Sequence, residues 1–295
     1  MHHRVELINV ELERILEEFA PQPTKLRAAM DYSLFAGGKR LRPILVLAAA
    51  EAVAGQRMKR EQLLSAACAI ECLHTYSLIH DDLPAMDDDD WRRGKATNHK
   101  VFGEGIAILA GDALLTLCFE ILSQRLGGFR AEQVLQVIAE VAGAAGGQGM
   151  VGGQAADILW EKEQEREGEP DQLLQYIHEH KTGALLVASV RTGAILADAE
   201  PEQLAALTDY ARAIGLAFQI TDDLLDIYGD SSKLGKRTGQ DEARGKLTYP
   251  AVHGVVEARR RVKELVRHAN ASLQSFGSGA DPLRALADFL AERES

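Results

Sequence analysis

Apolar residues recur with helical periodicity along almost the whole chain of 295 residues, and strand-like alternation is nearly absent. Only 5% of the residues are aromatic, whereas Leu, Ala and Glu are abundant, which favours helices over sheets. Most prolines stand near the boundaries of the apolar segments, where they do not interrupt a helix interior. The sequence therefore predicts an all-α fold, with helices at about residues 5–19, 24–36, 42–55, 60–83, 105–126, 131–144, 172–196, 201–228, 249–275 and 281–293.

Two segments fit this helical pattern poorly. Residues 143–157, GAAGGQGMVGGQAAD, contain six glycines, and local propensity alone predicts a linker between two domains there. The length of the chain allows either one large domain or two. The charged run 160–171 is typical of an exposed loop or a helix end, and we assign no chemistry to it.

The composition argues against several classes of protein. A formal net charge of −11 argues against a nucleic-acid-binding surface. No stretch of about 18 residues is expected to span a membrane, and the N-terminus lacks a signal-peptide pattern, so we expect a cytoplasmic location. Cys68, Cys72 and Cys118 lie inside apolar helical stretches, which favours small buried side chains over disulfides or a zinc site.

A dense acidic cluster follows the apolar stretch 63–79. The sequence HDDLPAMDDDDWRRG, residues 80–94, places six aspartates in ten positions at the end of a helix that should be buried. Pro84 should end this helix near residue 80, so Asp87 must return toward Asp81 through a turn. Because unpaired charges are costly to bury, such a cluster must face water, become neutral or bind cations.

A second acidic cluster lies in FQITDDLLDIYG, residues 218–229. Asp222, Asp223 and Asp226 fall within an arc of about 100° on one helix face, so their mutual repulsion invites a cation. Oxygen ligands without nearby His or Cys suit hard cations, and Mg²⁺ in particular binds through one or two carboxylates together with substrate phosphates.

Basic residues that could bind such phosphates occur in several short groups. Gly37 and Gly38 precede one of these groups and would let the backbone approach an anion closely. Arginine can contact phosphate in a bidentate manner, and lysine acts as a mobile point charge. The basic residues are Lys39, Arg40, Arg42, Arg92, Arg93, Lys181, Lys236 and Lys246.

Eight ordered blocks together resemble the trans-isoprenyl diphosphate synthases, most closely the bacterial type of farnesyl diphosphate synthase. The resemblance covers almost the whole chain and implies one helical bundle, residues 1–295, around a deep central cavity. It also implies that the small residues of 143–157 lie in a packed helix and not in a linker. The blocks are GGKRLRP (37–43), HTYSLIHDDLPAMDDDDWRRG (74–94), NHKVFGE (98–104), LAGDALL (109–115), GGQAAD (152–157), HKTG (180–183), FQITDDLLD (218–226) and GKLTYP (245–250).

The resemblance implies that dimethylallyl or geranyl diphosphate is held by about three Mg²⁺ ions between the two acidic clusters. The implied metal ligands are Asp81, Asp82, Asp87, Asp222, Asp223 and Asp226. Residues implied to contact the allylic substrate or its diphosphate are Arg92, Lys181, Thr182, Gln219, Lys236 and Lys246. Those implied to bind isopentenyl diphosphate are Gly38, Lys39, Arg42, His74 and Arg93. For Thr182 and Gln219, ordinary hydrogen bonding to the backbone is an equally open alternative.

The length of the product depends on the cavity below the first acidic cluster. Tyr76 and Ser77 precede Asp81 by roughly 6–7.5 Å along the helix, and a tyrosine there should close the pocket. This resembles synthases that stop at farnesyl diphosphate, with geranylgeranyl diphosphate as the alternative product. A terpene cyclase and a non-catalytic partner subunit are further alternatives. The resemblance also implies a homodimer, and it leaves open the role of Trp91, where the family commonly has leucine.

Overall fold

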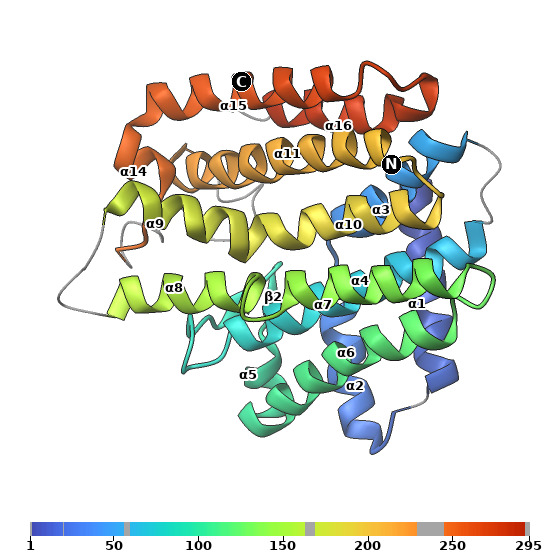
Figure 1. Ribbon diagram of the computed structural model, residues 1–295. Coiled ribbons are helices and arrows are strands. Elements are labelled where there is room, and N and C mark those ends of the chain that lie inside the picture. The colour runs from blue at the N-terminus through green and yellow to red at the C-terminus, as the bar shows by residue number, and fades with distance from the viewer. Residues whose placement is uncertain (1, 20, 56–59, 163–168, 229–244, 293–295) are drawn as a thin grey trace. The chain divides into compact units, whose positions relative to one another are not determined.

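The computed structural model describes residues 2–19, 21–55, 60–162, 169–228 and 245–292, which are almost entirely helical (Figure 1). The all-α prediction is therefore confirmed. The helices are α1 (His2–Phe19), α2 (Thr24–Leu34), α3 (Leu41–Ala54), α4 (Arg60–Asp81), α5 (Asn98–Phe102), α6 (Glu104–Gln124), α7 (Ala131–Ala145), α8 (Met150–Lys162), α9 (Pro170–Ile177), the π-helix η2 (His178–Gly183), α10 (Ala184–Leu196), α11 (Pro201–Tyr228), α14 (Tyr249–His253), α15 (Val255–Ser272), the 3₁₀ turn η3 (Ser278–Ala280) and α16 (Asp281–Glu292). Strands β1 (Trp91–Arg92) and β2 (Lys95–Ala96) form a small antiparallel hairpin.

The chain divides into two compact units. The first comprises Met1–Leu47 and Lys59–Ile138, and the second comprises Ala48–Met58 and Ala139–Ser295. The divisions fall within α3 and α7, and not within the glycine-rich segment 143–157. The single domain over residues 1–295 stays a prediction, and each unit is described separately below.

In the first unit, α4 packs against α1 and α6, and α2 packs against α6. Helix α1 contributes an apolar face whose spacing follows the helical repeat, with Ile8, Leu12, Ile15 and Leu16 fully buried. Burial of each such side chain stabilises the folded state by about 1.5–3 kcal/mol. This packing fixes the end of α4, where the first acidic cluster begins.

In the second unit, α11 packs against α10, α15 and the π-helix η2. Tyr210 of α11 is fully buried, and its hydroxyl donates a hydrogen bond of 2.7 Å to the carbonyl oxygen of Leu283. Helix α8 packs against η2, and a β-carbon added at Gly153 would lie 2.1 Å from the backbone nitrogen of Lys181. These two backbones can approach so closely only because residue 153 has no side chain.

The glycine-rich segment is therefore not a linker. Residues 146–149 form a turn after α7, and α8 begins at Met150 and continues through the remaining small residues. The packed helix implied by the family resemblance is confirmed for 150–157, and the linker predicted from propensity is wrong. Tertiary packing outweighs the low helix propensity of glycine, which costs about 1 kcal/mol per residue. The run 160–171 includes the end of α8, where Trp160 is 9% exposed, and the start of α9.

Several predicted helix boundaries need correction. Helix α4 ends at Asp81 and not at residue 83, because Pro84 cannot continue it. The helix predicted at 172–196 is interrupted by the π-helix η2, and that predicted at 249–275 is divided at Gly254. Gly254 has φ +83°, outside the helical region and accessible at low cost to glycine. The hairpin of β1 and β2 was not predicted, since each strand has only two residues.

By length and composition alone, two stretches are long and apolar enough to cross a membrane. The prediction that the sequence contains no such stretch is therefore corrected. The two stretches are Glu104–Gln124, with 44% of its most apolar window buried, and Ala131–Glu161, with 28% buried. Polar residues are too sparse in these stretches to lower their mean hydropathy below that of a membrane span. In the described structure, α6 packs against α2 and α4, as a core helix does.

Candidate functional site

The turn after α4 brings two aspartates of the first cluster together. The backbone nitrogen of Asp87 donates a hydrogen bond of 2.9 Å to the carbonyl oxygen of Asp81, and that of Asp89 donates one of 3.2 Å to Asp82. The return of Asp87 through a turn is thereby confirmed. The side chains of Asp81 and Asp87 are both half-buried, so neither carboxylate is withdrawn into the core.

Asp82 of the same cluster is held by an arginine. It is 3% exposed, and the Nε and Nη2 atoms of Arg92 lie 2.7 and 2.6 Å from its Oδ1 atom. Burial raises the pKa of Asp82, and the hydrogen bond from Arg92 opposes that shift. Arg92 lies in β1, so the hairpin carries the counter-ion of a carboxylate at the end of α4. Its predicted contact with a diphosphate stays a prediction.

The residues implied to bind isopentenyl diphosphate gather at the loop before α3. Gly37 and Gly38 have φ values of +98° and +130°, which favour glycine. Arg93 donates a hydrogen bond to the carbonyl oxygen of Gly37, and a β-carbon at Gly38 would lie 2.6 Å from its Nη1 atom. Lys39 in the same loop is exposed. The guanidinium group of Arg93 therefore lies directly against the backbone of this loop.

His74 of α4 lies in the field of these arginines. Burial lowers its pKa well below the usual value of 6.5, and the positive charges of Arg42 and Arg93 lower it further. A neutral imidazole beside several guanidinium groups leaves their positive charge available to an anion. The structure therefore brings Gly38, Arg42, His74 and Arg93 into one basic region, as the resemblance implies.

Replacing His74 with Gln should make the free energy of unfolding depend less on pH under acidic conditions. Because the pKa of His74 is depressed in the folded state, the contribution of His74 to the free energy of unfolding is present above about pH 6.5. This contribution is lost as the pH falls below that value. Unfolding free energies from urea titrations should therefore fall less steeply for His74→Gln than for the wild type, by at most about 1.4 kcal/mol per pH unit. Parallel curves for the two proteins below about pH 6.5 would show that His74 does not titrate with folding.

Tyr76 and Ser77 lie one turn before the first cluster. Tyr76 is 6% exposed, and its ring meets that of His80 edge to face with 5.7 Å between the centroids. Burial raises the pKa of Tyr76 to about 12, and the nearby charge of Asp81 contributes to the shift. Ser77 donates a hydrogen bond of 2.9 Å to the carbonyl oxygen of His74 within the helix. Tyr76 is thus fixed in place as a neutral aromatic group.

A polar pocket in the second unit contains most of the residues predicted there. The pocket has a cavity volume of about 170 Å³ and opens to solvent. Its walls come from α8, α9, η2, α11 and the segment before α14. The lining residues are Asp157, Ile177, His178, Lys181, Thr182, Gln219, Asp222, Asp223, Lys246, Leu247 and Thr248.

A chain of side-chain hydrogen bonds crosses one wall of this pocket. Thr182 donates a bond of 2.8 Å to Oε1 of Gln219, and Nε2 of Gln219 donates one of 2.9 Å to Oδ1 of Asp223. The backbone nitrogen of Tyr249 donates a bond of 2.9 Å to Oδ2 of Asp223, and Nε2 of His178 lies 3.5 Å from the same oxygen. Asp223, 4% exposed, therefore connects η2, α11 and α14.

Lysines provide the positive charge of the pocket. Lys181 of η2 forms a close ion pair with Asp157 of α8, which is 5% exposed. Lys246 lies 3.7 Å from Oε1 of Glu161. Sequence reasoning missed Asp157 as a partner of Lys181, although the block GGQAAD contained it, and it assigned no chemistry to the run that contains Glu161. Lys236 lies outside the described residues.

The donor set of the two clusters fits Mg²⁺. A backbone hydrogen bond brings Asp87 next to Asp81, both side chains are half-buried, and Asp222 lines the polar pocket. Mg²⁺ typically uses one or two carboxylates and completes its coordination with water and phosphate oxygens. Asp82 and Asp223 are already engaged by Arg92 and Gln219.

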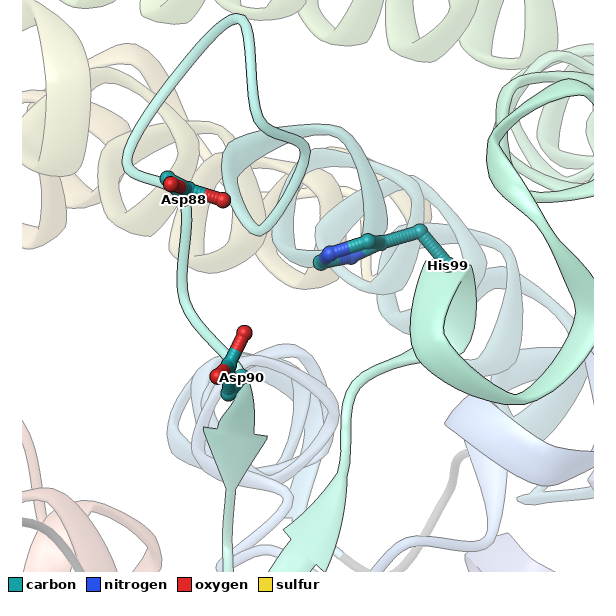
Figure 2. A group of neighbouring side chains, drawn as sticks. All are labelled: Asp88, Asp90 and His99. Atoms are coloured by element: carbon teal, nitrogen blue, oxygen red, sulfur yellow. The ribbon is translucent and has the colours of Figure 1, made fainter.

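Among the residues that the structure describes, a different group is compact enough to hold a cation by itself. Asp88, Asp90 and His99 place one ligand atom each within 4.8 Å of one another (Figure 2). These residues were not among the predicted ligands, because Asp88 and Asp90 were expected to be solvated or structural members of the cluster and His99 was not considered as a ligand.

Comparison with known proteins identifies the family. The profile of the polyprenyl synthetase family matches residues 23–277, which include both acidic clusters and the glycine-rich segment. The chain belongs to the polyprenyl synthetase family. Like its relatives in that family, it is a trans-prenyltransferase of isoprenoid biosynthesis, and the family depends on Mg²⁺.

Individual polyprenyl synthetases resemble the chain over most of its length. It is 50% identical over 271 residues to a dimethylallyltranstransferase of Fischerella ambigua (strain UTEX 1903), covering 92% of this chain and 77% of that one. It is 45% identical over 298 residues to a geranylgeranyl diphosphate synthase of Cyanophora paradoxa, covering 100% and 96%. The crystal structure of an apo FPP/GFPP synthase from Zymomonas mobilis matches with a TM-score of 0.83 at 40% identity, covering 97% and 96%.

Trp91 stays without an assigned role in this polyprenyl synthetase. Its side chain is 68% exposed and pairs across the hairpin with Ala96. Such exposure argues against a part in the core of the first unit.

Proposed function

We propose that this prenyltransferase condenses dimethylallyl or geranyl diphosphate with isopentenyl diphosphate to give farnesyl diphosphate. The observation that carries the choice of product is the burial of Tyr76 one turn before Asp81. A large, fixed aromatic side chain at this position would limit the space for a growing prenyl chain. Dimethylallyl, geranyl and isopentenyl diphosphates are the substrates, and no nucleic acid takes part.

The allylic diphosphate is bound by positive charge from this chain and by Mg²⁺. About three Mg²⁺ ions, held by the two acidic clusters, would neutralise charge on the leaving diphosphate. Lys181 and Lys246, which line the polar pocket, and Lys236 add positive charge, and Arg92 acts mainly by orienting Asp82. The allylic carbon–oxygen bond then breaks, with the electron pair leaving on the diphosphate, and an allylic cation remains.

Isopentenyl diphosphate is bound in the basic region around His74. Gly38, Lys39, Arg42 and Arg93 contact its diphosphate, while its double bond attacks the allylic cation and forms the new carbon–carbon bond. A proton then leaves the condensed cation for the departed diphosphate, and a new double bond forms. Thr182 and Gln219 orient the allylic partner through their mutual hydrogen bond.

Product analysis with the purified protein tests this proposal. With geranyl diphosphate, isopentenyl diphosphate and Mg²⁺, we expect farnesyl diphosphate to be the main product in mass analysis. Geranylgeranyl diphosphate is the second candidate, and relatives named as geranylgeranyl synthases favour it. A cyclised hydrocarbon would indicate a cyclase, no turnover would indicate a non-catalytic partner, and either result would refute the proposal.

Tyr76→Ala should lengthen the product. Removing the ring opens space below the first acidic cluster, so a share of the product should shift from fifteen carbons to twenty or more. The loss of a buried aromatic group should also lower the free energy of unfolding by about 3–5 kcal/mol. Tyr76→Phe is the matched control, since it retains the ring and should retain the wild-type product length. Unchanged chain length in Tyr76→Ala would exclude Tyr76 as the limiting residue.

We further propose that the protein is a homodimer in which α6 contributes to the interface. Ile108 and Leu109 of this helix are 43% and 53% exposed, on the side opposite its buried face. Leu109→Glu should convert the dimer to a monomer in light scattering, because it would bury an unpaired charge. Val256→Glu on α15, where Val256 is 85% exposed, is the control and should leave the mass unchanged. A dimer that survives Leu109→Glu would place the interface elsewhere.

A further inference from the structure

The group of Asp88, Asp90 and His99 follows Asp87 in the chain but includes none of the residues used in the proposed reaction. Asp88 and Asp90 belong to the segment between α4 and β1, and His99 belongs to α5. Figure 2 shows the imidazole ring of His99 pointing toward the space between the two carboxylates. Asp88 and Asp90 are exposed, whereas His99 is only 6% exposed. The group therefore opens to solvent on its acidic side and is anchored on its imidazole side.

The surroundings of His99 prepare one ring nitrogen as a ligand. Its Nδ1 atom lies 3.2 Å from Oγ1 of Thr97, a residue that is 2% exposed. In the tautomer that carries its proton on Nδ1, that nitrogen donates to this oxygen and Nε2 keeps a lone pair. The Nε2 atom is buried and has no hydrogen-bond partner. Histidines that bind metals commonly donate their second nitrogen in this way, which fixes the tautomer and the ring orientation.

The two carboxylates provide the negative charge for a cation. Lys100 lies 2.7 Å from Oδ1 of Asp90. The side chains of Lys100 and Asp90 are 43% and 61% exposed, and such surface ion pairs are weak. A divalent ion can therefore replace the ammonium group at Asp90. Asp88 has φ +51°, a conformation that aspartate tolerates better than most residues.

We propose that Asp88, Asp90 and His99 bind one divalent transition-metal ion of the Zn²⁺ type, separately from the Mg²⁺ of the reaction. Imidazole nitrogen suits Zn²⁺ and its neighbours in the transition series, whereas Mg²⁺ prefers oxygen ligands. Three protein ligands leave a coordination position for water. The bound ion links the segment between α4 and β1 to α5. These two parts of the chain precede and follow the hairpin that carries Arg92.

Equilibrium dialysis against Zn²⁺ in a large excess of Mg²⁺ tests this site. All proteins carry His2→Ala and His3→Ala, so that the N-terminal histidines do not contribute. We expect one Zn²⁺ per chain in this background, and a loss of at least about tenfold in affinity in His99→Gln and in the double variant Asp88→Asn/Asp90→Asn. His268→Gln, which changes an exposed histidine of α15, is the matched control and should retain the ion.

Two further measurements separate a ligand role from a structural one. Thr97→Val removes the hydrogen-bond partner of Nδ1 and should weaken Zn²⁺ binding by about 10–100-fold. In the Co²⁺-loaded protein, NMR should show a strongly shifted exchangeable Nδ1–H signal that disappears in His99→Gln. If His99→Gln does not fold, the exposed double variant decides the result. Absence of Zn²⁺ binding in the background protein, or equal binding in that protein and the double variant, overturns the proposal.

Discussion

Asp222→Asn should lower kcat by about a thousandfold, the equivalent of about 4 kcal/mol in the activation free energy. Asp222 lines the polar pocket with Lys181 and Lys246, and its side chain is half-buried, whereas Asp223 and Asp226 are buried. The amide of asparagine has nearly the same shape but no charge, so it weakens metal binding without opening a cavity. The effect should appear in both kcat and kcat/KM, because the metal acts on charge that develops as the diphosphate leaves.

Asp209→Asn on the same helix is the matched control. Asp209 is exposed and lies 3.8 Å from Arg212 in a surface ion pair, so its replacement should leave kcat within about twofold of the wild-type value. Steady-state assays with geranyl and isopentenyl diphosphates at several Mg²⁺ concentrations provide the comparison. If Asp222→Asn keeps most of its activity, Asp222 does not bind a metal required for ionisation.

Arg40→Ala should destabilise the protein by about 3–5 kcal/mol, because it leaves a buried carboxylate without its counter-ion. Arg40 and Glu71 form an ion pair of 2.8 Å, and their side chains are 2% and 3% exposed. Arg40 also donates hydrogen bonds of 3.0 Å to Asn9 and 2.6 Å to the carbonyl oxygen of Leu34. Its guanidinium group thus joins α1, α2 and α4 within the first unit.

Urea unfolding monitored by circular dichroism measures this loss. Arg40→Met/Glu71→Leu should recover most of the stability, since it removes both charges and retains volume. Arg212→Ala, at a pair where Arg212 is 72% exposed, should change the unfolding free energy by less than about 0.5 kcal/mol. A loss in Arg40→Ala no larger than in Arg212→Ala would mean that water or a rearranged side chain compensates Glu71.

Local sequence features predicted the helices and turns that carry the site better than they predicted the contacts between its side chains. Pro84 was sufficient to predict a helix end near residue 80, close to the observed end of α4 at Asp81, and the return of Asp87 to Asp81, whereas the apolar pattern alone extended the helix to residue 83. The two-residue strands and the division at Gly254 were missed, since short elements have too few residues to show a pattern.

Ionic partners that are distant in sequence could not be predicted. The sequence grouped Arg40, Arg92 and Lys181 as candidate phosphate ligands, but each also pairs with a carboxylate, namely that of Glu71, Asp82 or Asp157. Such pairs depend on which helices pack together, and residue type alone does not encode that choice.

The glycine-rich segment illustrates the same limit for backbone structure. Propensity favoured a linker at 143–157, whereas the close approach of Gly153 to Lys181 requires a residue without a side chain in a packed helix. Family resemblance gave the better prediction because it carries information about packing between distant segments.

We propose that both acidic clusters bind one allylic diphosphate through shared Mg²⁺, and the proposed function depends most directly on this sharing. Calorimetric titration with a non-cleavable thiolo analogue of geranyl diphosphate, with and without Mg²⁺, tests it in the wild type, Asp81→Asn, Asp222→Asn and the double variant. We predict Mg²⁺-dependent binding and a double-variant loss that differs from the sum of the single losses by more than about 0.5 kcal/mol. Losses that simply add, or affinity that does not depend on Mg²⁺, would contradict the claim.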